Sequence, residues 1–187
     1  MIGVEVKGVA LRLETAPGLF SPQRADRGTL AMLSYAQFTP GMKVLDLGCG
    51  CGLVGILAAH CCGEENVIMS DIDPLAVEIA RRNALRNGVG GVRAEVSDGF
   101  SAIGEAGFDL ILSNPPYQSD FSVAKRFIEK GFNRLKIGGR MLMVTKRRDW
   151  YRNKFVAIFG GVGIHEIDGY FVFEAQKRDG RYANRRG

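Results

Sequence analysis

The sequence predicts a doubly wound α/β fold with a mostly parallel seven-stranded sheet that ends in an antiparallel hairpin. Short apolar segments alternate with longer segments of helical periodicity, an arrangement typical of parallel strands covered by helices. One of the short segments stops at three glycines that alternate with other residues, Gly48, Gly50 and Gly52. Near the end of the chain, Asp168 and Gly169 separate two strand-like segments and predict a tight hairpin.

The first forty residues are expected to form an arm and a helix. Residues 4–13 alternate between apolar and polar side chains, which predicts a strand or a hairpin arm. The proline- and glycine-rich residues 15–22 predict a loop, and the apolar residues 30–38 predict a helix that Asp26 or Thr29 can cap.

After this arm, strands and helices alternate. The strands are short apolar segments bounded by turn residues, expected at residues 43–47, 66–70, 92–97, 108–113, 141–145, 164–167 and 170–175. The helices are expected at residues 53–59, 74–87, 123–135 and 150–159. Pro74 suits a first helical position, and Gly138 with Gly139 is expected to close the third helix. Because neither a linker nor a repeat is visible, we expect a single domain over residues 1–187.

Length and composition narrow the class of protein. With 187 residues, 46% of them hydrophobic, the chain can bury one sizeable core. Its apolar runs are shorter than a membrane span, and no signal peptide is visible, so we expect a cytoplasmic protein with no membrane partner. The four cysteines have neither a zinc-site spacing nor a disulfide pattern, so we expect no metal: Cys49, Cys51, Cys61 and Cys62.

Basic residues gather in two places, and the first of these, the tail, alone carries +4 of the net charge of +5. The tail, residues 177–187, has five basic residues against one acidic residue: Lys177, Arg178, Arg181, Arg185 and Arg186. A second cluster follows the expected fifth strand: Lys146, Arg147 and Arg148. Both segments could be simply solvated, or they could contact the phosphates of a nucleic acid.

The glycine turn has more than one interpretation. Residues 50–55 fit the GxGxxG pattern of dinucleotide sites, in which a helix N-terminus holds a pyrophosphate. Asp46 precedes the turn by two residues, and its carboxylate would repel a phosphate while attracting an amino or sulfonium group. S-adenosylmethionine (SAM) has such groups, so a SAM site, a dinucleotide site and a ligand-free turn are the three alternatives.

Polar residues stand at the expected carboxyl ends of four strands: Asp46, Asp71, Asp98 and Asn114. Ligands bind at this edge of a doubly wound sheet. Asp71, 23 residues after Gly48, is spaced to meet ribose hydroxyls, whereas Asp73 resembles a helix cap and Asp98 can accept from an adenine amino group. The candidate cofactor-binding residues are Asp46, Gly48, Cys49, Gly50, Gly52, Asp71, Ile72, Asp98, Gly99 and Asn114.

The most specific motif is the tetrapeptide Asn114, Pro115, Pro116 and Tyr117, or NPPY. Two prolines fix the backbone and supply no N–H groups, so the loop presents acceptors. The Asn114 side-chain oxygen and the Pro115 carbonyl can accept both hydrogens of a planar amino group and aim its lone pair at a methyl donor. Tyr117 can stack on a planar substrate. We therefore take these four residues as candidate catalytic residues.

Five segments resemble a group of class I SAM-dependent methyltransferases, the small-domain family that includes ribosomal RNA guanine 2-amino methyltransferases. They are residues 17–21 (PGLFS), 26–29 (DRGT), 44–50 (VLDLGCG), 70–71 (SD) and 113–117 (SNPPY). The resemblance implies a Rossmann-like fold, SAM as cofactor with S-adenosylhomocysteine as product, methylation of a base in structured RNA, and Phe20 as a candidate lid over the cofactor.

The resemblance leaves other functions open. Similar NPPY motifs occur in enzymes that methylate adenine amino groups or protein glutamine amides, and a SAM-binding partner subunit without activity is a third possibility. Familiar bacterial members resemble two fused copies of the domain, whereas this chain has one. Either a partner or homodimer, or the two basic segments, would then supply affinity for RNA.

Overall fold

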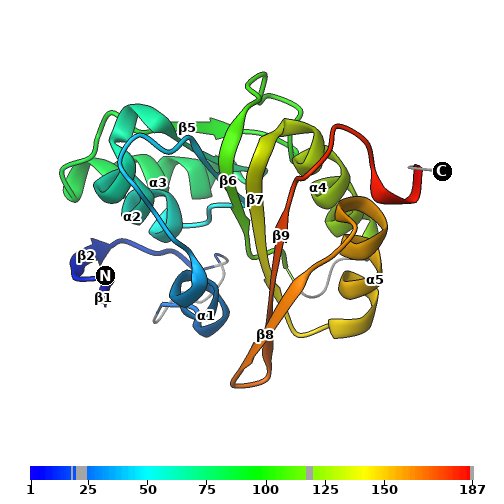
Figure 1. Cartoon of the computed structure of the whole chain (residues 1–187). Coiled ribbons are helices and arrows are strands. Elements are labelled where there is room, and N and C mark those ends of the chain that lie inside the picture. The colour runs from blue at the N-terminus through cyan, green and yellow to red at the C-terminus, as the bar shows by residue number, and fades with distance from the viewer. Residues whose placement is uncertain (18, 20–24, 117–119, 186–187) are drawn as a thin grey trace.

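The computed structural model describes residues 1–17, 19, 25–116 and 120–185, and a seven-stranded sheet lies at its centre (Figure 1). Neighbouring strands in the sheet are, in order, β5 (Arg93–Val96), β4 (Val67–Asp71), β3 (Val44–Leu47), β6 (Phe108–Ser113), β7 (Leu135–Thr145), β9 (Tyr170–Gln176) and β8 (Gly163–Ile167). The first five pair in parallel, whereas β9 is antiparallel to both β7 and β8. The predicted fold class is confirmed.

Helices cover both faces of the sheet (Figure 1). One face holds α1 (Arg27–Tyr35), α2 (Leu53–Cys62) and α3 (Pro74–Arg86), and the other holds α4 (Phe121–Arg134) and α5 (Arg148–Phe159). Because side chains alternate along a strand, Val44 joins the apolar cluster beneath the first three helices, and Leu45 joins the cluster beneath the other two. None of the helices in the described part of the chain has both the length and the apolar character to cross a membrane.

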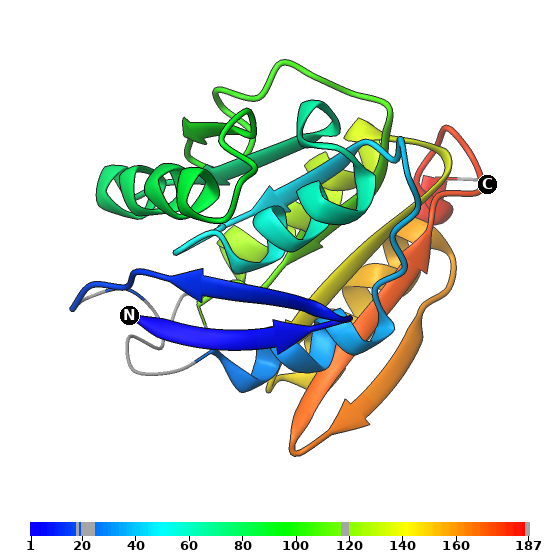
Figure 2. The ribbon, with the colours of Figure 1, turned by 90° about the vertical axis from the view of Figure 1, so that its left-hand side faces the viewer.

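The expected N-terminal arm is a two-stranded hairpin of β1 (Ile2–Val6) and β2 (Val9–Leu13), which runs beside α2 (Figure 2). Leu11 and Leu13 of β2 are fully buried in the core. Two asparagines of α3 and its C-cap hold the arm, since Asn87 Oδ1 accepts from the Arg12 N–H at 2.9 Å and Asn83 Oδ1 from the Glu14 N–H at 2.7 Å. The arm is therefore fixed to α2 and α3 by buried side chains and by polar contacts.

Most expected element boundaries agree with the structure within a few residues. Asp26 caps α1, and the turn between β8 and β9 has positive φ at both Asp168 and Gly169, as a type I′ hairpin requires. Helix α2 is longer than predicted and ends at Cys62, so Cys61 and Cys62 lie within the helix and not after it.

The prediction that Gly138 and Gly139 close a helix is wrong. Helix α4 ends at Arg134, and β7 begins at the next residue and includes both glycines. Gly138 N–H donates to the Lys177 carbonyl at 2.7 Å, and Lys177 N–H donates to the Gly139 carbonyl at 2.9 Å. A Cβ at Gly139 would lie 2.6 Å from the Phe108 carbonyl oxygen, so the glycine permits close strand contact where the register of β6 and β7 shifts.

Candidate functional site

A cavity of about 330 Å³ lies at the carboxyl edge of the parallel strands. Because β5, β4, β3 and β6 are neighbours, the segments that follow them come together at this edge. The predicted cofactor residues among its lining are Gly48, Gly50, Asp71, Ile72, Asp98, Gly99 and Asn114. A smaller cavity of about 80 Å³ adjoins the same loop and is lined by Asp46, Cys49 and Asn114, among others. Asn114 borders both cavities.

The glycine turn folds tightly over the end of β4. Gly48 and Cys49 both donate their N–H groups to the Ser70 carbonyl, at 2.8 and 2.9 Å. Gly52 is the N-cap of α2 with φ +90, a backbone conformation that a side chain would strain. Gly55, two residues into the helix, has no space for a side chain, because a Cβ there would lie 2.3 Å from Met69 Cγ. The glycines therefore permit a close approach between α2 and β4.

Asp46 is buried beneath this turn, with 2% of its surface exposed. Its Oδ2 accepts from the Gly55 N–H at 2.8 Å. Burial raises the pKa of the Asp46 carboxyl to about 7, the Gly55 hydrogen bond opposes that rise, and the negative charge of Asp71 adds to it. Asp46 lines the smaller cavity and is absent from the lining of the larger one. Its carboxyl can therefore exchange a proton near neutral pH beside the cavity.

Asp71 connects the end of β4 to the glycine turn. Its Oδ2 accepts from the Gly50 N–H at 2.9 Å, and its Oδ1 accepts from the Asp73 N–H at 3.0 Å. Both oxygens keep further acceptor capacity, and the residue lines the larger cavity. Asp73 caps α3 by accepting from the Leu75 N–H at 2.9 Å, which confirms its expected capping role. Ile72, between them, is 65% exposed and offers an apolar surface to the cavity.

Asp98 follows β5 and faces an arginine that sequence reasoning did not single out. Arg126 of α4 donates from its two terminal nitrogens to the two Asp98 oxygens, each at 3.3 Å. Both side chains are about half exposed, and both residues line the larger cavity. The two residues are 28 positions apart, and Arg126 looks like any solvated helix position, so no local signal indicates the pair.

Asn114 has the most informative hydrogen bonds at the site. Its Nδ2 donates one hydrogen to Asp26 Oδ2 at 2.7 Å and the other to Thr29 Oγ1 at 2.9 Å. Its Oδ1 is buried and has no hydrogen-bond partner among the described residues. Turning the amide over would set its oxygen against the Asp26 carboxylate, so the orientation is determined by charge. The structure therefore leaves a buried acceptor without a donor at the junction of the two cavities.

The rest of the NPPY motif is only partly described. Pro115 is buried, Pro116 is exposed, and both line the larger cavity. Tyr117 lies outside the described residues, as does Phe20, the candidate lid. The described part of the chain contains no group of three or more His, Cys, Asp or Glu side chains placed to hold a metal ion.

The cluster of Lys146, Arg147 and Arg148 is exposed and lies beside the site. Because Ser113 of β6 pairs with Met143 of β7, the residues that follow these two strands emerge next to each other. The Arg147 guanidinium lies over the ring of Phe121, 5.1 Å from its centroid. Phe121 in turn stacks on Trp150, with ring centroids 4.4 Å apart. The edge beside Asn114 therefore carries both positive charge and flat aromatic surface.

The described part of the basic tail, residues 177–185, lies elsewhere, and Lys177 corrects the expectation for it; Arg186 lies outside the described residues. Lys177 is buried, and its Nζ donates to the Leu135 carbonyl at 2.9 Å and lies over the Phe132 ring. Tyr182 packs edge-on against Phe132 and donates to the Glu129 carbonyl at 3.1 Å. These contacts place the start of the tail at the amino end of β7, away from the strand tips. Lys177 is a packing residue and is not available to a nucleic acid.

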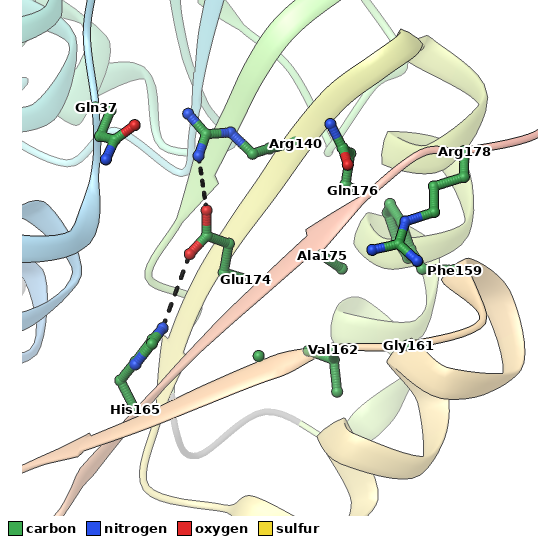
Figure 3. A pocket seen from close by; sticks show the side chains of 11 residues that line it. Gln37, Arg140, Phe159, Gly161, Val162, His165, Glu174, Ala175, Gln176 and Arg178 are labelled. Atoms are coloured by element: carbon green, nitrogen blue, oxygen red, sulfur yellow. Dashed lines mark hydrogen bonds and ion pairs between the residues drawn. The ribbon is translucent and has the colours of Figure 1, made fainter.

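A third cavity, of about 910 Å³, lies at that opposite edge (Figure 3). Glu174 stands at its centre, accepts from Arg140 Nη1 at 2.8 Å, and has His165 Nε2 at 3.8 Å (Figure 3). Tyr35 of α1 stacks on His165 at 3.9 Å. Arg178 of the basic tail also lines this cavity. Glu174 therefore has partners within this cavity, whereas Asn114 Oδ1 has none among the described residues.

A comparison with protein families agrees with this site. A family model described as the methyltransferase small domain matches residues 10–174. Among curated proteins, the ribosomal RNA small subunit methyltransferase C of Hahella chejuensis is 36% identical over 141 residues, which cover 73% of this chain and 41% of that protein. The protein of the same name from Pseudomonas putida is 30% identical over 172 residues, covering 89% of this chain and 51% of its own length. The chain thus spans about half the length of these relatives.

Among solved structures, the fold matches a T. thermophilus 16S rRNA methyltransferase that acts on a guanine N2 and was solved with AdoMet and guanosine. The TM-score is 0.85 with 27% identity, and the match covers 94% of this chain and half of that protein. A ribosomal protein L11 methylase from Lactobacillus delbrueckii matches with a TM-score of 0.73 at 17% identity, a likeness of fold alone.

Proposed function

The chain belongs to the methyltransferase small domain family, and on that premise we propose that it transfers the methyl group of SAM to the exocyclic amine of a guanine in ribosomal RNA. The observation that carries the proposal is Asn114 Oδ1, a buried atom with no hydrogen-bond partner in the part of the chain that the structure describes. A buried polar atom without a partner is costly, so such an atom at a cavity favours a ligand that donates to it. An amino group is such a donor.

The residues at the strand tips fit SAM. Asp71 has acceptor capacity for the two ribose hydroxyls, and Ile72 supplies an apolar surface against the adenine. The glycine turn lets the backbone approach a ligand closely, and the Asp46 carboxyl can balance a positive charge in the smaller cavity. When bound, SAM supplies an electrophilic methyl group on a sulfonium. Phosphate groups of a dinucleotide would instead meet carboxylates at three strand tips: Asp46, Asp71 and Asp98.

In the proposed mechanism the chain orients a weak nucleophile. The lone pair of a guanine 2-amino group is delocalised into the ring, and two acceptors on its hydrogens turn the nitrogen towards a tetrahedral geometry. Asn114 Oδ1 is one acceptor, and the Pro115 carbonyl is the other. Both also stabilise the positive charge that develops on nitrogen as its bond to the methyl group forms and the bond from that methyl group to sulfur breaks. The methylated nitrogen then releases one proton to solvent, which gives the neutral secondary amine. No nucleophilic side chain is required.

Three features support RNA as the substrate. The curated relatives and the T. thermophilus structure are named for methylation of ribosomal RNA. The exposed cluster of residues 146–148 can contact phosphates beside the site. The partly exposed ring of Trp150, which Phe121 supports from one face, can receive an unstacked base, which is how single-stranded RNA is commonly recognised.

The test is to incubate the protein with methyl-labelled SAM and small-subunit ribosomal RNA, digest the RNA, and identify the labelled nucleoside. We expect the label in N2-methylguanosine. Asn114→Ala is expected to lower turnover by roughly two to three orders of magnitude, because it removes a group that stabilises developing charge, while SAM affinity stays within a few-fold. Label on another nucleoside or on a protein glutamine, or wild-type turnover in the variant, would contradict the proposal.

A further inference from the structure

We propose that Asp26 and Thr29 are positioning residues for methyl transfer: together they hold the Asn114 amide with its oxygen turned towards the substrate amine. The inference rests on the proposed function and extends it to two residues at the start of α1. These residues lie 88 and 85 positions before Asn114 in the sequence. They therefore connect the N-terminal part of the chain to the catalytic loop.

The three side chains form a closed network in which each hydrogen is directed. Asn114 Nδ2 gives its two hydrogens to Asp26 Oδ2 and Thr29 Oγ1, at 2.7 and 2.9 Å. The Thr29 hydroxyl gives its own hydrogen to Asp26 Oδ2 at 3.2 Å. An ionised carboxylate can only accept, so the chain of donors ends at Asp26. A flipped amide would lose its hydrogen bond to Asp26 and place Asn114 Oδ1 against a carboxylate oxygen, and the Thr29 hydroxyl could bond to that Oδ1 only by withdrawing its hydrogen from Asp26.

This network has an electronic consequence for the oxygen that remains. Hydrogen bonds from both N–H groups to acceptors, one of them charged, draw amide resonance towards the form with more negative charge on Oδ1. Hydrogen bonds in a chain strengthen one another in this way, and bonds to ionised groups are the stronger kind. Asn114 Oδ1 should therefore be a better acceptor for an amine that becomes positively charged.

The network also gives a reason for an amide at position 114. A carboxylate there would place two negative groups about 3 Å apart, an arrangement in which both cannot stay ionised. An apolar side chain would leave Asp26 without the Asn114 donors. The amide both satisfies Asp26 and presents an oxygen to the cavity.

Asp26 permits a substitution that separates this role from helix capping. Its Oδ2 also accepts from the Thr29 N–H at 2.7 Å and so caps α1. Serine caps a helix about as well as aspartate but is one atom shorter, so Asp26→Ser keeps the cap and withdraws the acceptor from Asn114. Asp26→Asn keeps an acceptor oxygen without the charge. Thr29→Val removes the second acceptor at nearly constant shape, and Thr29→Ser restores it.

The experiment measures kcat and KM with ribosomal RNA, together with SAM affinity by calorimetry, for these variants. Asp26→Ser is expected to lower kcat by about tenfold to a hundredfold, part of the loss that removal of a whole charge-stabilising group causes. KM and SAM affinity should change by less than about threefold. Thr29→Val should lower kcat less, Thr29→Ser should recover it, and Asp26→Asn should lie between wild type and Asp26→Ser. Asp120→Ser, the same change at the N-cap of α4, is the matched control and should leave kcat unchanged.

A double-mutant cycle tests whether the two residues act through Asn114. In the Asn114→Ala background, Asp26→Ser should cause almost no further loss of kcat, because the group that it positions is gone. Independent losses that multiply, an unchanged kcat in Asp26→Ser, or a loss confined to SAM affinity would each overturn the assignment.

A readout that needs no activity separates this proposal from the proposed function. The side-chain NH₂ resonances of Asn114, identified by their absence in Asn114→Ala, should exchange slowly with solvent in the wild type and faster in Asp26→Ser. Equally fast exchange in both proteins would overturn the proposal that Asp26 and Thr29 hold the Asn114 amide. Slow exchange in a wild-type protein that methylates no RNA would refute the proposed function alone.

Discussion

Arg126 and Asp98 face each other in the lining of the 330 Å³ cavity at the carboxyl ends of the strands, with both terminal guanidinium nitrogens 3.3 Å from the two carboxylate oxygens. Because both side chains are about half exposed, this ion pair contributes little to stability. A ligand that donates to Asp98 can therefore share this carboxylate with Arg126, or take the place of Arg126, at a small cost in free energy. Substituting each residue of the pair in turn therefore tests whether Asp98 contacts the adenine amino group.

Asp98→Ala should lower SAM affinity by about tenfold, the value of one hydrogen bond to a charged group, whereas Arg126→Gln should change it by less than about threefold. Isothermal calorimetry gives both dissociation constants. Equal losses in the two variants would show that the ion pair matters and the adenine contact does not.

Asp71→Ala should weaken SAM binding by roughly tenfold to a hundredfold, because it removes a charged acceptor for two ribose hydroxyls. It also removes the acceptor of the Gly50 N–H, so unfolding must be measured beside affinity. Asp73→Ser is the control, since it keeps the cap of α3 and should leave SAM affinity unchanged. An unchanged dissociation constant in folded Asp71→Ala would remove Asp71 from the site.

Asp46 should make stability depend on pH. Its pKa in the folded protein is about 7, above the ordinary 3.8, so between these values the folded state keeps a proton that the unfolded state has released. The free energy of unfolding should therefore fall as pH rises from about 4 to 7, by a few kcal/mol in total.

Asp46→Asn should remove this dependence, because an amide oxygen still accepts from Gly55 but does not titrate. Urea unfolding of both proteins at pH 5, 6, 7 and 8 tests this. The stability of the variant relative to the wild type should increase with pH up to about 7 and then level off. If the difference in unfolding free energy between the two proteins did not change with pH, a residue other than Asp46 would be the titrating group.

Neutralising Lys146, Arg147 and Arg148 together should flatten the dependence of RNA affinity on salt. Each lost phosphate contact changes the slope of log affinity against log salt by about 0.7 to 0.9, so the triple glutamine variant should lose roughly two to three units. Arg178→Gln with Arg181→Gln is the control at the other edge and should leave the slope unchanged. A flatter slope in the control variant, with an unchanged slope in the triple variant, would instead identify the tail as the RNA contact.

Truncation after Gln176 would not test the tail cleanly. It removes Lys177 and Tyr182, whose packing against Phe132 closes one end of the core. A loss of RNA binding in that variant would therefore be mixed with a loss of stability, which the charge substitutions avoid.

The parts of the fold that local pattern determines were predictable. Strand β6 has the predicted bounds, because an apolar segment between a glycine and a proline has few alternatives. Asp71 and Asp98 line one cavity, since parallel strands deliver their carboxyl ends to the same side of the sheet, whereas Asp46 is buried beneath the glycine turn and lines the adjoining smaller cavity.

The errors arise where a distant partner decides the structure. Gly138 and Gly139 look like a helix end, but pairing with Lys177, about forty residues later, makes them part of β7. Lys177 looks solvated, yet the Leu135 carbonyl and the Phe132 ring hold its ammonium group. In the same way, nothing near Asn114 in the sequence indicates that Asp26 sets the orientation of its amide.

Strand β7 has eleven residues and extends from the amino ends of the parallel strands to their carboxyl ends. At about 3.3 Å per residue it is roughly 35 Å long, with the tail at its start and residues 146–148 at its end. A dye or surface tether attached on η2 (Ala183–Arg185) would therefore be held well away from the strand tips. Single-molecule and immobilised-protein measurements can use that position and leave the proposed site accessible to a large ligand.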